Sequence, residues 1–355
     1  MVNLDNPKWA VVWGFRMENH FHTHSWIHSG FYRALKHLYG DRALWLDHTD
    51  DLNKIDLHDS IIITEHEAAK RGMPIHADNF HIIHGLNNDK VLFPQMASIK
   101  NKLGWDVHHD FSYGGTAIWN CENAVQLEEY KNFLKGLNPG PPRDEERNLN
   151  RIKIAEDFWY YPAEKNLNFR WATDLLPHEI EENKKTAKPW NPESKEIIYT
   201  GTRWFVNDLE LNQFDSACRE NGITFRTVGA GQNGVVSLED NVKNVQNSYF
   251  SPAISGSHHL TEGYVPCRIF KNISYGRMGI TNSKRVNDLF GGRLIFHPDC
   301  HQLFYHAKEQ LAQTTIEQVH ELMDFVADHH TYVNRISDVL KTAKLVMESE
   351  SRTAS

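Results

Sequence analysis

Short apolar runs alternate with amphipathic stretches along the first half of the chain. The run WAVVWGF at 9–15 is rich in β-forming residues and predicts a strand, and the stretch 30–39 has apolar positions at helical spacing. The alternation continues with ALWLDH (43–48), SIIITEHEAAKRG (60–72), FHIIHG (80–85) and the helix-like ENAVQLEEYKNFLKGL (122–137). Because parallel strands need crossover connections and bury both faces, this pattern predicts parallel β-α-β units and the α/β class.

A second series of the same kind begins at residue 196. The run EIIYTG (196–201) predicts its first strand, and the elements expected after it are helix 209–221, strand 223–231, helix 237–247, strand 251–255, helix 267–275 and strands 278–283 and 293–298. Two stretches rich in proline and charge, 138–150 and 184–195, have the composition of exposed loops. We expect the domain boundary at 184–195, because the new series starts directly after it.

The predicted organisation therefore has two α/β halves and a helical end. Its parts are an N-terminal Rossmann-like domain (1–183), a linker (184–195), a C-terminal Rossmann-like domain (196–308), a helical segment (309–347) and a disordered tail (348–355). A length of 355 residues agrees with two domains, because single hydrophobic cores stop growing at about 250 to 300 residues.

Charge and composition argue against several classes of protein. The formal net charge of -8 disfavours a nucleic-acid-binding protein, which needs a basic face. We expect no membrane span, because no apolar stretch approaches about 18 residues, and no signal peptide at the N-terminus. The cysteines at 121, 218, 267 and 300 form no C-x-x-C pair, which argues against a zinc ribbon and a redox motif. A reduced, cytoplasmic setting fits these scattered cysteines best.

Candidate ligand-binding residues follow the strands of the second half, where open α/β sheets bind their ligands. Thr200 to Trp204 offer a glycine, hydroxyls and a guanidinium that suit a phosphate or a sugar hydroxyl, although a tight turn with an exposed arginine has the same sequence. The glycines at 229 and 231 permit close approach of a flat ligand, but they serve equally in a plain turn. Arg268 and Lys271 lie near the start of a predicted helix, where cations are disfavoured unless an anion binds there.

One segment carries a family resemblance. The stretch TEGYVPCRIFKNISYG followed by GITNS resembles the donor-binding segment of GT-B glycosyltransferases, especially the branch with the spore-maturation CgeB-like proteins. EIIYTGTRW resembles the start of their C-terminal domain and FRWATDLLPHEI (169–180) the end of their N-terminal one, and the similarity is clearest over 169–305. The resemblance implies two Rossmann-like domains facing each other across a cleft, with the donor held mainly by the second domain and the acceptor by the first.

The resemblance also assigns donor-binding residues. Glu262 matches the first glutamate of the paired-glutamate motif of retaining members, but Phe270 and Lys271 stand where the second would be, which puts a retaining mechanism and the ribose contact in doubt. Arg268 falls on the helix that faces the diphosphate. The donor-binding residues expected in this way are Thr200, Gly201, Thr202, Arg203, Gly229, Gly231, Glu262, Arg268, Lys271, Asn272, Asn282 and Ser283.

Histidines cluster directly after the first predicted strand. The segment ENHFHTHSWIHSG contains His20, His22, His24 and His28, and a neutral histidine in this loop can take the proton from an acceptor hydroxyl. We expect His22, His24 and Asp110 to be catalytic, although a chain with 22 histidines also has histidines without a role.

Two other functions fit parts of the sequence. His-x-His after a first strand is also how many metal-dependent hydrolases begin their metal site, and the further ligands available are His76, Asp78, His108, His109 and Asp110. A closed (β/α)₈ barrel, however, would not restart with a second glycine-rich series. A non-catalytic sugar-binding protein of the same architecture is the other alternative, and Trp26, Trp105 and Trp119 can stack on sugar rings in either case.

The reaction expected from the sequence is sugar transfer from a nucleoside diphosphate sugar, of UDP or GDP type, to a hydroxyl acceptor such as a glycan. Thr202, Arg203, Arg268 and Lys271 would stabilise the charge that develops on the leaving diphosphate. No Asp-x-Asp motif of metal-dependent transferases is present, so we expect neither a metal nor another cofactor to be required.

Overall fold

The computed structural model describes residues 2–18, 22, 24–86, 99–107, 150–155, 158–201, 203, 207–229 and 236–353. Contacts between Cα atoms divide the chain into two compact units. Unit 1 consists of Met1–His108, Asp144–Leu176 and Thr331–Ser355, and unit 2 of His109–Arg143 and Pro177–His330. Both contain parallel strands and helices, which confirms the predicted α/β class.

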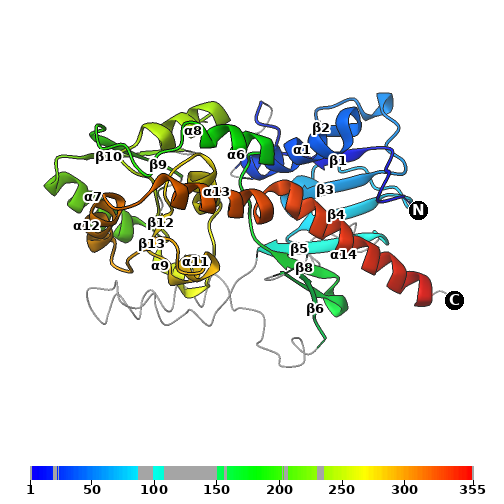
Figure 1. Cartoon of the computed structure of the whole chain (residues 1–355). Coiled ribbons are helices and arrows are strands. Elements are labelled where there is room, and N and C mark those ends of the chain that lie inside the picture. Colours follow the sequence, from blue (N-terminus) through cyan, green and yellow to red (C-terminus); the bar gives the residue numbers. More distant parts are fainter. Residues whose placement is uncertain are drawn as a thin grey trace. The chain divides into compact units, whose positions relative to one another are not determined.

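Unit 1 is built on one mixed sheet (Figure 1). Its described strands are β1 (Ala10–Trp13), β2 (Ala43–Leu46), β3 (Ile61–Glu65), β4 (Phe80–His84), β5 (Lys102–Val107), β6 (Ile152–Ala155), β7 (Phe158–Tyr161) and β8 (Asn166–Phe169). They lie in the order β2-β1-β3-β4-β5-β8-β7-β6, and only the pairs β8–β7 and β7–β6 are antiparallel. All residues of β1 and β3 are buried, as expected for central parallel strands covered on both faces.

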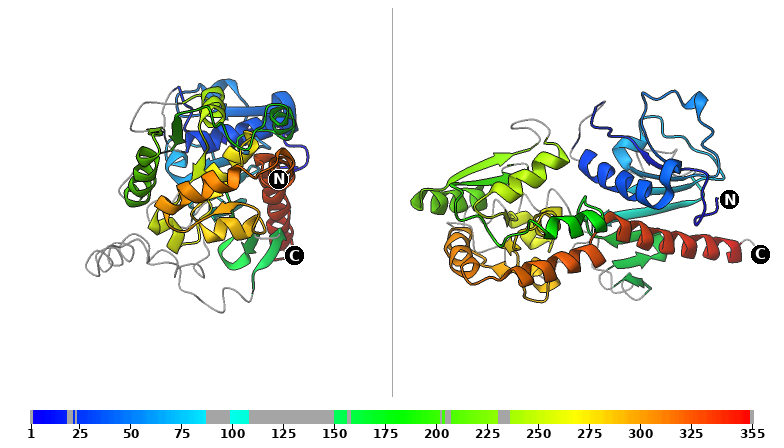
Figure 2. Two further views of the ribbon diagram at one scale, coloured as in Figure 1. Left: turned by 60° about the vertical axis from the view of Figure 1, so that its left-hand side comes forward. Right: turned by 45° about the horizontal axis from the view of Figure 1, so that its top comes forward.

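Two helices from opposite ends of the chain cover this sheet. Helix α1 (Ser25–Tyr39) follows β1, and α14 (Tyr332–Thr353), red in Figures 1 and 2, packs on α1 and β5. Gly30 permits their close approach, since a Cβ atom there would lie 2.3 Å from the ring of Tyr332. The last helix of the chain is thus part of the first unit.

Unit 2 contains the second predicted series. Parallel pairs join β10 (Thr224–Val228) to β9 (Glu196–Thr200), and β12 (Ile280–Thr281) to both β11 (Pro252–Ala253) and β13 (Ile295–Phe296). The described helices are α6 (Pro177–Lys184), α7 (Asp208–Glu220), α8 (Leu238–Asn247), α9 (Ser257–Thr261), α10 (Cys267–Ser274), α11 (Lys284–Leu289), α12 (Cys300–Leu311) and α13 (Ile316–His329). Strand-helix alternation places the ends of β9, β10, β11 and β12 on loops that lead into helices.

Some elements differ from the sequence prediction. Helix α14 continues to Thr353, into the tail for which the composition predicts disorder, and the helical segment expected from 309 begins earlier, with α12. The expected helix at 122–137 lies outside the described residues. No helix among the described residues has both the length and the apolar character that a membrane span requires.

Candidate functional site

The strand order of unit 1 reverses direction at β1. The chain passes from β1 to β2 on one side and then to β3 on the other side, which makes the β1/β3 position a topological switch point. Ligands of open α/β sheets bind at such points, beyond the carboxyl ends of the strands. The loop that follows β1 carries His22 and His24, β3 ends at Glu65 and β4 ends at His84.

His24, Glu65 and His84 form a compact cluster at this edge. Each offers one nitrogen or oxygen atom, and these atoms all lie within 4.8 Å of one another. The rings of His24 and His84 are 5.2 Å apart and nearly perpendicular, at 89°. We call these three residues the His-Glu-His cluster.

Local hydrogen bonds hold Glu65 in place. It is the N-cap of the short helix α2 (His66–Ala69), where its Oε2 accepts hydrogen bonds from the backbone N–H groups of Glu67 (2.7 Å) and Ala68 (3.2 Å). Its Oε1 contacts Nδ1 of His66. Gly85 makes room for that histidine: its φ is +70°, and a Cβ atom there would lie 2.6 Å from Nδ1 of His66.

The cluster combines neutral imidazoles with a carboxylate at neutral pH. Burial lowers the pKa of His24 to about 4 and that of His84 to about 3, against the opposing effect of the Glu65 charge. Burial acts to raise the pKa of Glu65, but the hydrogen bond from His66 and the neighbouring histidines lower it to about 2. Nδ1 of His24 and Nδ1 of His84 are buried, and neither has a hydrogen-bond partner among the described residues.

His22 in this loop and His28 at the start of α1 have structural contacts. His22 stacks on Phe15 with ring centroids 4.4 Å apart, and its Nδ1 accepts a hydrogen bond from the backbone N–H of His24 at 3.2 Å. His28 is buried, with Nδ1 2.8 Å from the carbonyl oxygen of Gly14. His20 and Asp110 lie outside the described residues.

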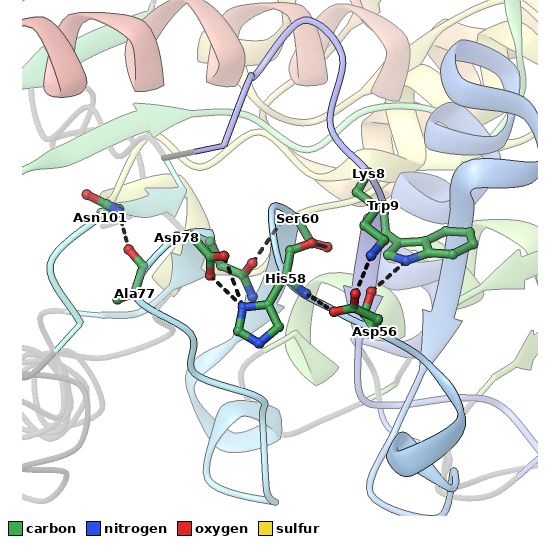
Figure 3. A network of polar contacts seen from close by, with 9 residues as sticks. Lys8, Trp9, Asp56, His58, Ser60, Ala77, Asp78 and Asn101 are labelled. Carbon is green, nitrogen blue, oxygen red and sulfur yellow. Dashed lines mark hydrogen bonds and ion pairs between the residues drawn. The ribbon is translucent and has the colours of Figure 1, made fainter.

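Two of the expected metal ligands, His76 and Asp78, lie at the opposite edge of the sheet, and Figure 3 shows Asp78 in contact with His58. His76 and Asp78 precede β4, at its amino end, and His58 precedes β3 at the same edge. Nδ1 of His58 is 3.0 Å from the Asp78 carboxylate, and its ring is 4.1 Å from that of His76. His76 and Asp78 therefore cannot share an ion with His24, because amino and carboxyl ends of parallel strands lie at opposite edges. His108 and His109 fall outside the described residues.

The aromatic residues near the cluster are mostly core. Trp105 is 2% exposed and packs against Phe169 (ring centroids 4.7 Å apart) and His84 (4.2 Å), so it is not available as an open platform for a sugar ring. Trp171, which the sequence analysis did not single out, lies 5.4 Å from His84 by ring centroids. Trp26 is half-buried on α1, and Trp119 lies outside the described residues.

In unit 2, Arg268 lies at the carboxyl end of β9. Its Nε donates to the carbonyl oxygen of Thr200 at 2.7 Å, and its Nη1 donates to the hydroxyl of Tyr199 at 2.5 Å and to the carbonyl oxygen of Ile254 at 3.4 Å. Nη2 has no hydrogen-bond partner among the residues that the structure describes. The guanidinium covers Gly201 so closely that a Cβ atom there would lie 1.9 Å from Nη2.

Some buried polar atoms at or after strand ends in unit 2 and on α9 are also unsatisfied. Thr200 Oγ1 ends β9, Ser255 Oγ follows β11 and His258 Nδ1 lies on α9, and these buried atoms have no hydrogen-bond partner within the described part of the chain. Gly229 directly follows the neighbouring strand β10, and a Cβ atom there would be 3.2 Å from the backbone of Gly201. Because buried polar groups are normally paired, this edge has the character of a ligand site.

Several expected donor-binding residues have structural contacts. Asn272 donates to the Ser251 carbonyl oxygen (2.8 Å), and Asn282 bonds both backbone groups of Ser255 (2.8 Å each). Ser283 caps α11.

The remaining expected residues lie around α7, α9 and α10. Arg203 Nε donates to Asp208 at 2.7 Å, which ties it to α7. Glu262 is buried at the end of α9, 3.5 Å from His258. Lys271 is half-buried on α10, while Thr202 and Gly231 lie outside the described residues.

Sequence reasoning missed Glu65, His84, Thr200 Oγ1 as an unpaired group, and Ser255. The available signal was that each is at or directly after the end of a buried apolar run.

Comparison with known proteins finds no family model that matches the chain and no curated protein that matches it significantly. The chemistry of the chain's own residues is therefore the basis for assigning its function.

Proposed function

We propose that the chain is a glycosyltransferase of the GT-B type, which transfers a sugar from a nucleoside diphosphate sugar to a hydroxyl acceptor. In this proposal unit 2 binds the diphosphate and unit 1 binds the acceptor. The resemblance of residues 261–283 to a donor-binding segment favours it, and so does the chemistry at the carboxyl ends of the strands in both units.

The observation that carries the proposal is the position of Arg268. Three hydrogen bonds hold its guanidinium at the ends of β9 and β11, and Gly201 leaves no side chain beside Nη2. A cation held in this way is preorganised for an anion, and a guanidinium fork matches phosphate oxygens. The leaving group of the reaction is a diphosphate, whose developing charge Arg268 would stabilise.

The His-Glu-His cluster provides the proton acceptor. During transfer the acceptor oxygen forms a bond to the anomeric carbon, the bond from that carbon to the phosphate oxygen breaks, and the hydroxyl proton passes to His24. The carboxylate of Glu65, which has an oxygen within 4.8 Å of a His24 ring nitrogen, would stabilise the imidazolium that forms. No metal ion is needed for these steps.

Titration of nucleoside diphosphate into Arg268 variants tests the proposal. We expect Arg268→Ala to weaken UDP or GDP binding by roughly 30-fold to 1000-fold, the equivalent of about 2 to 4 kcal/mol, and Arg268→Lys to restore only part of it because lysine lacks the fork. Calorimetry on the full chain measures this.

The matched control is Arg226→Ala. Arg226 is a cation of unit 2 in the middle of β10, where its Nε is 2.7 Å from Glu196 rather than at the strand end. Because Arg268 also supports Thr200 and Tyr199, unfolding temperatures of the ligand-free variants must be compared with that of the wild type. Equal diphosphate binding by wild type, Arg268→Ala and Arg268→Lys would contradict the proposed donor site.

A further inference from the structure

We propose that His24, Glu65 and His84 bind a divalent transition-metal ion, with zinc the best match, and that zinc at this site inhibits sugar transfer. The binding site stands on geometry alone, whereas the inhibition rests on the proposed function. The transfer reaction does not require this ion, and the ion competes with the hydroxyl proton for His24.

The geometry is close to that of a metal centre. The three ligand atoms lie within 4.8 Å of one another and come from the loop after β1 and from the last residues of β3 and β4. Zinc bonds of about 2.0 to 2.2 Å place neighbouring ligand atoms about 3.4 Å apart in a tetrahedron, so small rotations of the side chains complete the site.

A second observation also indicates a ligand. Nδ1 of His24 and Nδ1 of His84 are both buried, and the described residues provide no hydrogen-bond partner for either. Buried polar atoms are normally paired, and a shared cation would satisfy both nitrogens together. Two buried imidazole nitrogens without a partner beside one carboxylate are what a bound ion would account for.

The donor set determines which ion binds. Two imidazoles and a carboxylate suit zinc and similar transition metals, whereas magnesium and calcium prefer all-oxygen sites. Glu65 is already oriented by the N–H groups of Glu67 and Ala68, which act as the outer partners that metal ligands commonly have. Three protein ligands leave a fourth position for water.

Inhibition follows from the chemistry of imidazole. A neutral imidazole has one basic nitrogen, because the other carries a proton. Zinc bound to His24 occupies that nitrogen, and Glu65 then neutralises the ion instead of stabilising an imidazolium. The histidine can no longer accept the proton of the acceptor hydroxyl.

Zinc titration into the chelator-treated full chain tests the binding site. We expect one zinc ion per chain with a dissociation constant in the micromolar range or below. Glu65→Gln and His84→Gln should each weaken binding at least tenfold, because a mutation of one ligand removes a third of the protein donors. His58→Gln is the matched control, since His58 lies at the opposite edge of the same sheet and should leave binding unchanged.

Cobalt distinguishes this site from adventitious binding to other histidines. Co²⁺ bound to the wild type should give the visible absorption of a four-coordinate ion, and both ligand variants should lose it while keeping the unfolding temperature of the metal-free wild type. Equal zinc affinity and equal cobalt spectra in wild type, Glu65→Gln and His84→Gln would overturn the site.

The experiments on zinc binding and on zinc inhibition can each give a negative result while the glycosyltransferase proposal stands. Zinc should abolish nucleoside diphosphate release from a nucleotide sugar at the concentration that saturates the calorimetric site, and equimolar magnesium should not. Full turnover with the site occupied by zinc would overturn the inhibition. Absence of zinc binding in a chain that turns over nucleotide sugar overturns the metal site and leaves the glycosyltransferase proposal intact.

Discussion

His28 illustrates how burial changes the chemistry of one residue. It is buried in α1, and burial lowers its pKa from 6.5 to about 4 although its Nδ1 bonds to Gly14. Between these two values the unfolded chain binds more protons than the folded chain, so the free energy of unfolding falls as pH falls from about 6.5 towards 4. His24 and His84 act in the same direction.

His28→Asn should therefore make stability less sensitive to acid. Asparagine can still donate to Gly14 but does not titrate, so we expect the loss of unfolding free energy between pH 7 and pH 5 to be about 2 kcal/mol smaller than in the wild type. Denaturant unfolding at both pH values measures the difference. An identical loss in variant and wild type would show that His28 does not titrate as its burial requires.

At this scale the sequence predicts part of the cluster. His24 could be chosen because it follows the first strand, and the structure places it at the carboxyl edge. Glu65 and His84 could not, because they meet His24 only through the order and register of β1, β3 and β4. His76 and Asp78 have equally suitable side chains, but each precedes a strand and therefore lies at the other edge.

Helices α1 and α14 depend on a contact with no local signal. Gly30 faces Tyr332, whose ring would be 2.3 Å from a Cβ atom at position 30, and Phe31 lies 4.8 Å from the same ring by centroids. Alanine usually stabilises a helix relative to glycine. Here the methyl group enters an occupied space, and overpacking of this kind costs about 1 to 3 kcal/mol.

We therefore expect Gly30→Ala to lower the free energy of unfolding. The measurement is denaturant unfolding of the full chain, and Tyr332→Leu in the same background should recover part of the loss because it removes the ring edge. A stabilised Gly30→Ala variant would mean that α14 does not pack on α1 in solution.

Sequence patterns predict the elements of unit 2 more closely than those of unit 1. Helices expected at 209–221, 237–247 and 267–275 correspond to α7, α8 and α10, because apolar residues at helical spacing mark all three, and Ser237 also caps α8. The hairpin strands β6 and β7 were not predicted. β6 is a short strand at the edge of the sheet with two exposed residues, and such strands have weak alternation.

The whole molecule adds long-range connections that local patterns do not contain. The last helix joins the first unit, where Arg335 donates to the carbonyl oxygens of Arg170 (2.6 Å) and Trp171 (3.0 Å), and Thr331 pairs with Thr173. Composition and strand-helix alternation predict the α/β class, but the contact of α14 with the residues around Arg170 depends on packing alone. The domain limits expected from the linkers place the boundary at 184–195, whereas the contacts divide the chain at Pro177, and they do not reveal the return of α14 to unit 1.

The most direct test of the proposed glycosyl transfer is the release of nucleoside diphosphate from a panel of UDP- and GDP-sugars in excess chelator. We expect the wild type to release diphosphate from at least one donor, faster with a hydroxyl-bearing glycan present. His24→Gln should reduce the rate about 100-fold or more without weakening diphosphate binding, because it removes only the proton acceptor. Equal release by wild type and His24→Gln would contradict the account. Absence of release from every donor of the panel, with and without added zinc, would also contradict it.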